Sequence, residues 1–236
     1  MRRVRILGLA LVAVFVMSAV AVASASAALP ELTKPKSTTE LTKKGLKGKK
    51  LGANPILENK KSEKVECTEA ELKSGEGKGT KEVTKVKILF SGCTASFGFV
   101  ECNNKGKNGK GEIETNELEG EIAYINKSKT EVGFLLKPAT GQTVFVTFEC
   151  GGIAKQEVKG SVISKIGEVN KEIKTGEHLT VKYKKGAGAG EQEVTKLEGK
   201  TGEFFLESKL NKGAFEKSNE QAEGSVEFEE AAELKA

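Results

Sequence analysis

Residues 131–150, which read EVGFLLKPATGQTVFVTFEC, decide the class of fold. Apolar side chains recur at every second position in two runs, one over 132–136 and one over 144–150. A repeat of two residues is typical of β-strands that place one face on a core and the other in water. Residues 138–141 (PATG) separate the two runs with a short turn-forming segment. The stretch therefore predicts two strands joined as a hairpin.

The same alternation recurs on both sides of this stretch. Residues 85–90 and 179–184 carry apolar side chains at alternate positions, and segments rich in Gly or Asn lie at 74–79, 103–109 and 186–190. Several short strands at this spacing predict an all-β fold. We expect an antiparallel β-sandwich with two disulfides. A β-barrel is the alternative, because sequence pattern alone does not separate the two architectures.

The first 28 residues have the composition of a secretory signal peptide. Arg2, Arg3 and Arg5 precede an apolar run over 6–22, and small residues fill 23–28. A positive segment, an apolar segment and a small-residue cleavage region in this order indicate export. We therefore expect a signal peptide over 1–28 and a secreted, extracellular or cell-envelope-associated protein. The mature chain is expected to have no transmembrane span, since no second apolar stretch is long enough.

Residues 29–62 differ in composition from the rest of the chain. They are rich in Lys, Thr and Gly, contain three prolines, and include the basic run KKGLKGKK from Lys43 to Lys50. Because few large apolar groups occur here, we expect an N-terminal tether over 29–62 and a single all-β domain over 63–236. The run Lys43–Lys50 has the charge to attract an anionic wall polymer, and a solvated tether is its other interpretation.

Cys67, Cys93, Cys102 and Cys150 form an even set in a chain with an export signal. Such sets are generally oxidised outside the cytosol, so two disulfides are expected. We favour Cys93–Cys102, which closes a short loop, together with Cys67–Cys150. The pairing Cys67–Cys93 with Cys102–Cys150 is the alternative. Zinc is disfavoured because no Cys-x-x-Cys occurs and the single histidine is distant in sequence.

Charge and composition exclude several classes of partner. Without its first 28 residues the chain has 35 lysines, 33 glutamates, no arginine and no aspartate. Interleaved Lys and Glu are typical of a solvated surface. Arginine supplies the planar fork that reads phosphate and guanine, so we expect no nucleic-acid partner. Calcium loops favour aspartate oxygens, and we expect neither a metal nor a cofactor.

His178 is the single histidine and the candidate general base at neutral pH. Ser161 and Ser164 are the serines considered as nucleophiles beside it. However, residues 160–163 (GSVI) lack the second glycine of a nucleophile elbow. With 33 glutamates in the chain, a pair of carboxylates carries no specificity for glycoside hydrolysis. We expect a protein that is not an enzyme, with a secreted hydrolase using His178 as an alternative.

Several short motifs and one further cysteine follow one another along the chain in this order: FSGC over 90–93, Cys102, GEIET over 111–115, LEG over 118–120, FEC over 148–150 and GSVI over 160–163. In this order they resemble a group of secreted, cysteine-containing, β-rich proteins of unknown function from high-GC actinobacteria. The resemblance runs from about residue 65 to the C-terminus. It implies export and a disulfide-linked β fold, and it carries no activity, ligand or functional residue.

Together these observations favour a secreted or cell-wall-associated structural or binding protein whose ligand the sequence does not name. An extracellular carrier of a small apolar molecule inside a β-barrel is the alternative. Phenylalanines on the strand faces motivate that second hypothesis.

Overall fold

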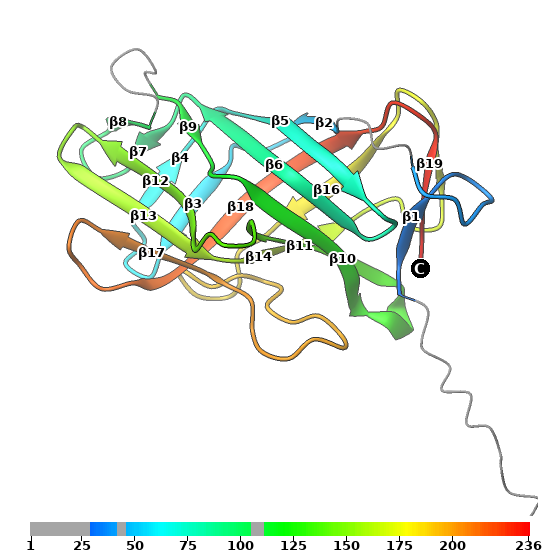
Figure 1. Cartoon of the computed structure of the whole chain (residues 1–236). Coiled ribbons are helices and arrows are strands. Elements are labelled where there is room, and N and C mark those ends of the chain that lie inside the picture. The colour runs from blue at the N-terminus through cyan, green and yellow to red at the C-terminus, as the bar shows by residue number, and fades with distance from the viewer. Residues whose placement is uncertain (1–28, 42–45, 105–110) are drawn as a thin grey trace, which may run out of the picture.

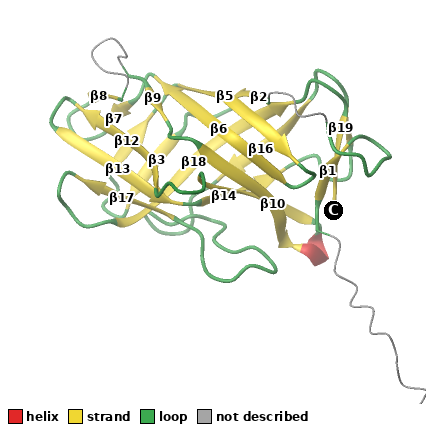
Figure 2. Cartoon of the chain, in the orientation of Figure 1, coloured by secondary structure: helices red, strands yellow, loops and turns green. Residues whose placement is uncertain are grey.

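The computed structural model describes residues 29–41, 46–104 and 111–236, so the predicted signal peptide over 1–28 lies outside the described residues. In that part of the chain all regular structure is β, apart from one short 3-10 helix (Figures 1 and 2). The elements are β1 (Glu31–Thr33), β2 (Lys47–Lys50), β3 (Ile56–Asn59), β4 (Lys64–Glu66), β5 (Glu69–Lys78), β6 (Glu82–Ser91), β7 (Thr94–Ala95), β8 (Val100–Asn103), β9 (Ile113–Glu114), β10 (Leu118–Asn126), η2 (Lys127–Lys129), β11 (Glu131–Pro138), β12 (Val144–Cys150), β13 (Ala154–Gly160), β14 (Val162–Ile166), β15 (Glu172–Ile173), β16 (His178–Tyr183), β17 (Leu206–Leu210), β18 (Glu216–Glu227) and β19 (Ala232–Lys235). The prediction of an all-β fold is confirmed.

Eight strands close into a barrel. Their order around the ring is β16-β14-β11-β10-β6-β5-β2-β18, and β18 pairs back to β16. All of these pairings are antiparallel. The barrel is the second of the two predicted architectures. A sandwich does not form because the edge strands β16 and β18 pair with each other, whereas a sandwich leaves its sheet edges unpaired.

The outer strands continue from β18 in a second hydrogen-bonded circuit. Its order is β18-β17-β13-β12-β8-β7-β4-β3, and β3 pairs back to β18. Ser218 at the start of β18 pairs with β17 and β3, whereas Gly224 near its end pairs with β16 and β2. The long strand β18 is therefore shared by both circuits, and it runs diagonally through the molecule in Figure 1.

The two runs within 131–150 are strands, but they do not form the predicted hairpin. β11 pairs with β10 and β14 in the barrel, and β12 pairs with β13 and β8 in the outer circuit. The connection between them is held against the start of β10. Ala139 N–H donates to the Glu117 carbonyl at 3.0 Å, and Thr140 N–H donates to the Glu119 carboxylate at 3.1 Å. These hydrogen bonds fix the connection by which the chain passes from the barrel to the outer circuit.

The N-terminal segment over 29–62 is built into the fold, which differs from the predicted tether. β2 lies between β5 and β18 and completes the barrel, and β3 pairs with β18 and β4. Lys47 and Lys49 of β2 are exposed, whereas Gly48 between them lines the barrel interior. β2 is a strand because its backbone hydrogen-bonds to β5 and β18. The lysine-rich composition of the segment gives no indication of these backbone hydrogen bonds.

One core cluster spans both circuits. It joins Val86, Leu118 and Val162 of the barrel to Phe148 and Val158 of the outer circuit. A second cluster lies at the end of the barrel where the small sheet β1-β19-β15 packs. Leu234 of β19 is fully buried there, and Figure 1 shows β1 and β19 together at that end, away from β8, β13 and β17. The interior of the barrel is thus covered at this end.

Candidate ligand-binding cavity

An apolar cavity of about 210 Å³ lies within the shared interior. Both circuits supply its walls, with Val86, Phe134 and Leu179 from the barrel and Phe145 and Leu206 from the outer circuit. A cavity of about 150 Å³ lined by Leu, Ile and Phe stays dry and holds benzene in another protein. By that comparison, the present cavity has room for a molecule with one ring and a short substituent.

Small residues on three neighbouring strands keep this space open. Gly48 of β2, Ala70 of β5, and Ala222 and Gly224 of β18 all line the cavity. At Gly48 an added Cβ would lie 2.3 Å from the Ser225 carbonyl oxygen, so no larger residue fits there. At Gly224 an added Cβ would meet only ordinary contacts, at 3.5 Å from Val181 and from the Lys49 carbonyl oxygen. A side chain is therefore sterically permitted at Gly224, and its absence leaves space.

Glu220 and Tyr183 add polar groups to this apolar wall. Both line the cavity. Glu220 lies on the same face of β18 as Ala222 and Gly224, because side chains alternate along a strand. Tyr183 is the register partner of Ala222 across β16 and β18. The carboxyl group and the phenol therefore belong to adjacent strands and share the interior face.

The Glu220 carboxyl group is held in an apolar environment. Burial raises its pKa from 4.5 to about 8, because desolvation penalises the charged form. Among the residues that the structure describes, none hydrogen-bonds or ion-pairs with this carboxyl group; the polar contacts of Glu220 are made by its backbone. At neutral pH the side chain is therefore mainly a neutral carboxylic acid with an unused donor.

Burial also raises the pKa of the Tyr183 hydroxyl. A side-chain interaction with Ser164 offsets part of that rise, whereas the negative charge of ionised Glu220 adds to it. Ser164 on β14 is fully buried, and its own hydroxyl has no hydrogen-bond partner of ordinary geometry in the described part of the chain. The phenol of Tyr183 consequently stays protonated over the whole physiological range and remains a donor.

A gap in strand pairing explains how Glu220 is positioned. On one side of β18, pairing with β17 ends at Ser218 and pairing with β16 begins at Ala222. The side chain of Gln192 fills this gap, since its amide donates to the Glu220 carbonyl at 3.0 Å and accepts from the Glu220 N–H at 2.9 Å. The same amide donates to the Lys184 carbonyl at 2.7 Å. The backbone at Glu220 is therefore fully paired.

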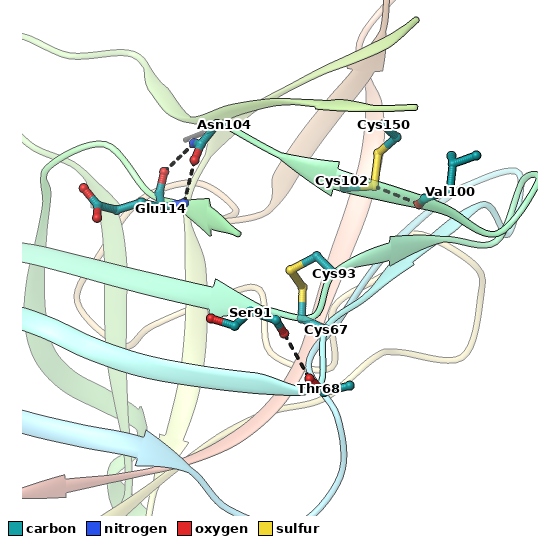
Figure 3. Close-up of a disulfide and its surroundings, with 9 residues drawn as sticks. All are labelled: Cys67, Thr68, Ser91, Cys93, Val100, Cys102, Asn104, Glu114 and Cys150. Atoms are coloured by element: carbon teal, nitrogen blue, oxygen red, sulfur yellow. Dashed lines mark hydrogen bonds between the residues drawn. A yellow bond between two sulfur atoms is a disulfide. The ribbon is translucent and has the colours of Figure 1, made fainter. Parts of the chain in front are cut away.

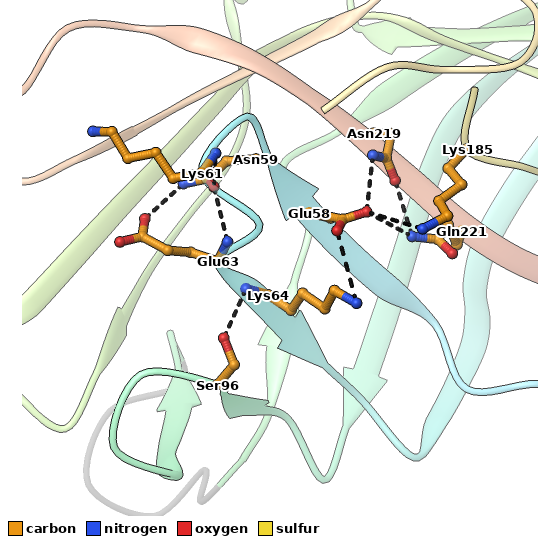
Figure 4. Close-up of polar contacts among 9 residues, drawn as sticks. All are labelled: Glu58, Asn59, Lys61, Glu63, Lys64, Ser96, Lys185, Asn219 and Gln221. Carbon is orange, nitrogen blue, oxygen red and sulfur yellow. Dashed lines mark hydrogen bonds and ion pairs between the residues drawn. The ribbon is translucent and has the colours of Figure 1, made fainter. Parts of the chain in front are cut away.

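A polar network on the outer face of β18 fixes the same region (Figure 4). Glu58 of β3 is buried and accepts from Asn219 at 3.4 Å and from Gln221 at 3.3 Å. Lys64 and Lys185 lie 3.7 Å and 3.9 Å from its carboxylate. Asn219 and Gln221 flank Glu220 in sequence, so holding them outward keeps Glu220 pointing inward.

The structure contains two disulfides, as predicted, but the favoured pairing is wrong. Cys67 is joined to Cys93, and Cys102 to Cys150 (Figure 3). Cys102 and Cys150 are direct register partners between β8 and β12. Cys93 and Cys102 are neighbours through their backbones, since Cys102 N–H donates to the Cys93 carbonyl at 2.9 Å, yet each side chain meets a partner from another strand. Loop length in the sequence does not reveal this register.

The candidate catalytic residues are not brought together. His178 is exposed at the start of β16 and pairs in register with Glu227. Ser164 lies beside Tyr183, and Tyr183 is five residues after His178 on β16. Ser161 N–H donates to the Phe205 carbonyl at 3.1 Å, between β13 and β14. The arrangement of these three residues provides no nucleophile–base pair.

The basic run from Lys43 to Lys50 is only partly described, because residues 42–45 lie outside the described ranges. Lys47 pairs in register with Glu227, and Lys49 with Glu71. Lys50 Nζ lies 3.1 Å from Asn54 Oδ1 and 3.9 Å from Glu69. Acidic or polar neighbours thus accompany each described lysine of β2.

Two further findings concern metals and membranes. Within the described ranges no group of three or more His, Cys, Asp or Glu side chains is placed to hold a metal ion. In the same part of the chain, no helix has the length and apolar character needed to cross a membrane.

Comparison of the chain with family models, with curated proteins and with solved structures finds no match. The resemblance to secreted actinobacterial proteins therefore stays a prediction. The fold class is that of a disulfide-linked antiparallel β-barrel with an internal apolar cavity.

Sequence reasoning placed Tyr183 on an alternating strand but did not single it out, and it missed Glu220 altogether. Residues 216–225 read EKSNEQAEGS, which has no apolar alternation to mark a strand. The usable signal lies just beyond this stretch. Val226 and Phe228 share the parity of Glu220, and both line the cavity. Counting back in steps of two from them would have placed Glu220 on the inner face.

Proposed function

We propose that this protein binds and carries a small apolar molecule inside its barrel. The observation that carries this proposal is the mainly apolar cavity of about 210 Å³, to whose inner wall Glu220 of β18, Tyr183 of β16 and Lys50 of β2 add a few polar groups. Ligand sites in proteins are typically concave and mainly apolar, with a few placed polar groups. The cavity lies in the interior that the barrel shares with the disulfide-linked outer circuit, a suitable frame for a rigid site.

The energetic cost of the cavity supports the same proposal. Unfilled apolar volume in a protein core lowers stability, because the surrounding side chains lose packing contacts. Larger side chains at Ala222 or Gly224 would reduce that cost, and the space around Gly224 permits one. A space that the chain does not fill itself is available to a ligand, whose binding stabilises the fold by mass action.

A direct test uses ethylbenzene, which has one ring and a short substituent. We expect the purified protein to bind it in calorimetric titration, and its melting temperature to rise with ligand concentration. Gly224→Val and Ala222→Leu fill the space and should weaken binding at least 10-fold while raising or preserving the melting temperature. Gly77→Val is the matched control, because an added Cβ at this strand glycine meets no atom within 4 Å. Gly77→Val should bind like the unaltered protein.

Two results would contradict the proposal. One is the absence of binding up to the solubility limit of the hydrocarbon. The other is unchanged binding in both cavity-filling variants. The prediction of a wall-associated binding or structural role, and that of an anionic wall polymer at Lys43–Lys50, are separate from this proposal and stay predictions. The hydrolase alternative with His178 gains no support from the positions of Ser161 and Ser164.

A further inference from the structure

We infer that the molecule carried in the cavity is neutral and bears one hydrogen-bond acceptor, such as a ketone, aldehyde or ether oxygen, which Glu220 and Tyr183 together recognise. This inference rests on the proposed carrier function and names the class of its ligand. It starts from the inner face of β16 and β18, where both side chains line the cavity on adjacent strands.

The protonated carboxyl group of Glu220 and the hydroxyl group of Tyr183 are both hydrogen-bond donors. The described residues offer no hydrogen bond or ion pair to the Glu220 carboxyl group, although Gln192 satisfies its backbone completely. A polar group that is left unpaired in an apolar environment lowers stability, and a ligand that pairs with it recovers part of this loss. Ser164, beside Tyr183 but outside the cavity lining, is a buried hydroxyl without a partner of ordinary geometry. The Glu220 carboxyl group therefore has hydrogen-bonding capacity that a ligand in the cavity can use.

Protonation makes Glu220 a donor at neutral pH. Desolvation raises its pKa to about 8, so the acid form predominates below that pH. A carboxylic acid kept neutral in an apolar site, next to a tyrosine hydroxyl, donates to a substrate oxygen in other proteins. The same pair of donors here suits an oxygen acceptor on an otherwise apolar molecule.

An anionic ligand fits this wall poorly. Lys50 is the lining residue with a cationic side chain on the inner face of β2, and its Nζ already contacts Asn54 at 3.1 Å and Glu69 at 3.9 Å. A carboxylate ligand would in addition lose the hydration of its charge in a mainly apolar space, which is costly without a cationic partner. A cationic amine would pair with ionised Glu220, but the pair would have to desolvate two charges in an apolar space, and such pairs gain little.

The groups around Glu220 define what a pH experiment measures. The other titratable residues that line the cavity are Tyr183 on β16, Lys49 and Lys50 on β2, Glu71 on β5 and Glu223 on β18. On β3 its register partner is Leu57, and Glu58 belongs to the network on the outer face with Lys64 and Lys185. Gln192 contacts its backbone and does not titrate. Among the groups that line the cavity, Glu220 is the one whose pKa burial raises into the range between pH 6 and pH 9.5.

The test compares three probes with nearly the same skeleton: ethylbenzene, acetophenone and 1-phenylethylamine. For the unaltered protein at pH 6 we expect acetophenone to bind at least 10-fold more tightly than ethylbenzene in calorimetric titration. Glu220→Leu should bring the two within about 2-fold. Glu220→Gln, which retains an N–H donor of similar size, should keep most of the preference. At pH 9.5 the preference should fall in the unaltered protein and persist in Glu220→Gln.

The outcomes separate this inference from the proposed function. Equal binding of ethylbenzene and acetophenone overturns the inference and leaves the carrier function standing. Tightest binding of 1-phenylethylamine also overturns it, because the ligand would then be a cation. A preference for acetophenone that survives in Glu220→Leu removes Glu220 from the recognition site. Failure of all three probes contradicts the carrier function itself.

Discussion

Glu220 gives the stability of the fold a definite dependence on pH. Its pKa is about 8 in the folded protein and 4.5 when exposed. As pH rises from 4.5 to 8, the unfolded chain releases a proton that the folded protein retains, so folding stability falls through this window. The contribution is complete below pH 4.5 and absent above pH 8. The largest loss consistent with this shift is about 5 kcal/mol.

Chemical denaturation at pH 5, 7 and 9 measures this dependence, with Glu220→Gln as the reference. We expect the free energy of unfolding of the unaltered protein to fall relative to that of Glu220→Gln as pH rises. The difference between the two proteins is the informative quantity, because other groups act oppositely. Lys137 holds the pKa of the Glu119 carboxyl below its usual value, so that group loses its contribution as pH falls. Parallel curves for the two proteins would contradict the assignment to Glu220.

At this scale the sequence reveals the candidate site only in part. Tyr183 follows Leu179 and Val181 in an apolar alternation, so its inward direction could be predicted. Glu220 and Ser164 could not be recognised as members of the same site. Their proximity to Tyr183 depends on which strands become neighbours, and a period of two residues specifies a face without specifying a partner.

At the scale of elements, the strands were predictable and their partners were not. Residues 132–136 and 144–150 lie in β11 and β12, as their alternation indicates. The turn residues between them favour a hairpin, yet the connection is hydrogen-bonded to Glu117, just before β10, and to Glu119 of β10 instead. β2 shows the converse error, because its backbone closes the barrel although its lysines suggested a solvated tether. Long-range pairing decided both cases.

Disulfide mapping without reduction tests the strand register directly. Cleavage after lysine leaves Cys93 and Cys102 together in peptide 88–105, and Cys67 in peptide 65–73. The register of β8 with β12 predicts one species in which both of these peptides and the Cys150 peptide are linked. A Cys93–Cys102 bond would instead leave peptide 88–105 unlinked. For the pairing seen in the structure, further cleavage after Glu101 separates the linked species into two parts. The Cys67 peptide stays attached to the Cys93 fragment, and the Cys150 peptide stays attached to the Cys102 fragment.

At the scale of the whole molecule, the two circuits depend on each other. They share β18, and the main core cluster contains residues of both. Neither circuit could close without β18, and neither could cover its apolar interior alone. A chain whose parts share one core is expected to unfold cooperatively, with a single free energy for its most protected amides.

Native-state hydrogen exchange tests this cooperativity with two fully buried reporters, Val132 of the barrel and Val158 of the outer circuit. We expect their amides to exchange with opening free energies within about 1 kcal/mol of each other. Leu206→Ala removes a buried side chain of β17 in the outer circuit, at a cost of about 2–5 kcal/mol. If the core is continuous, this change lowers the protection of Val132 as much as that of Val158, although Val132 lies in the other circuit. Loss of protection at Val158 alone would show that the outer strands unfold separately. The cavity, whose walls come from both circuits, would then open without unfolding of the barrel.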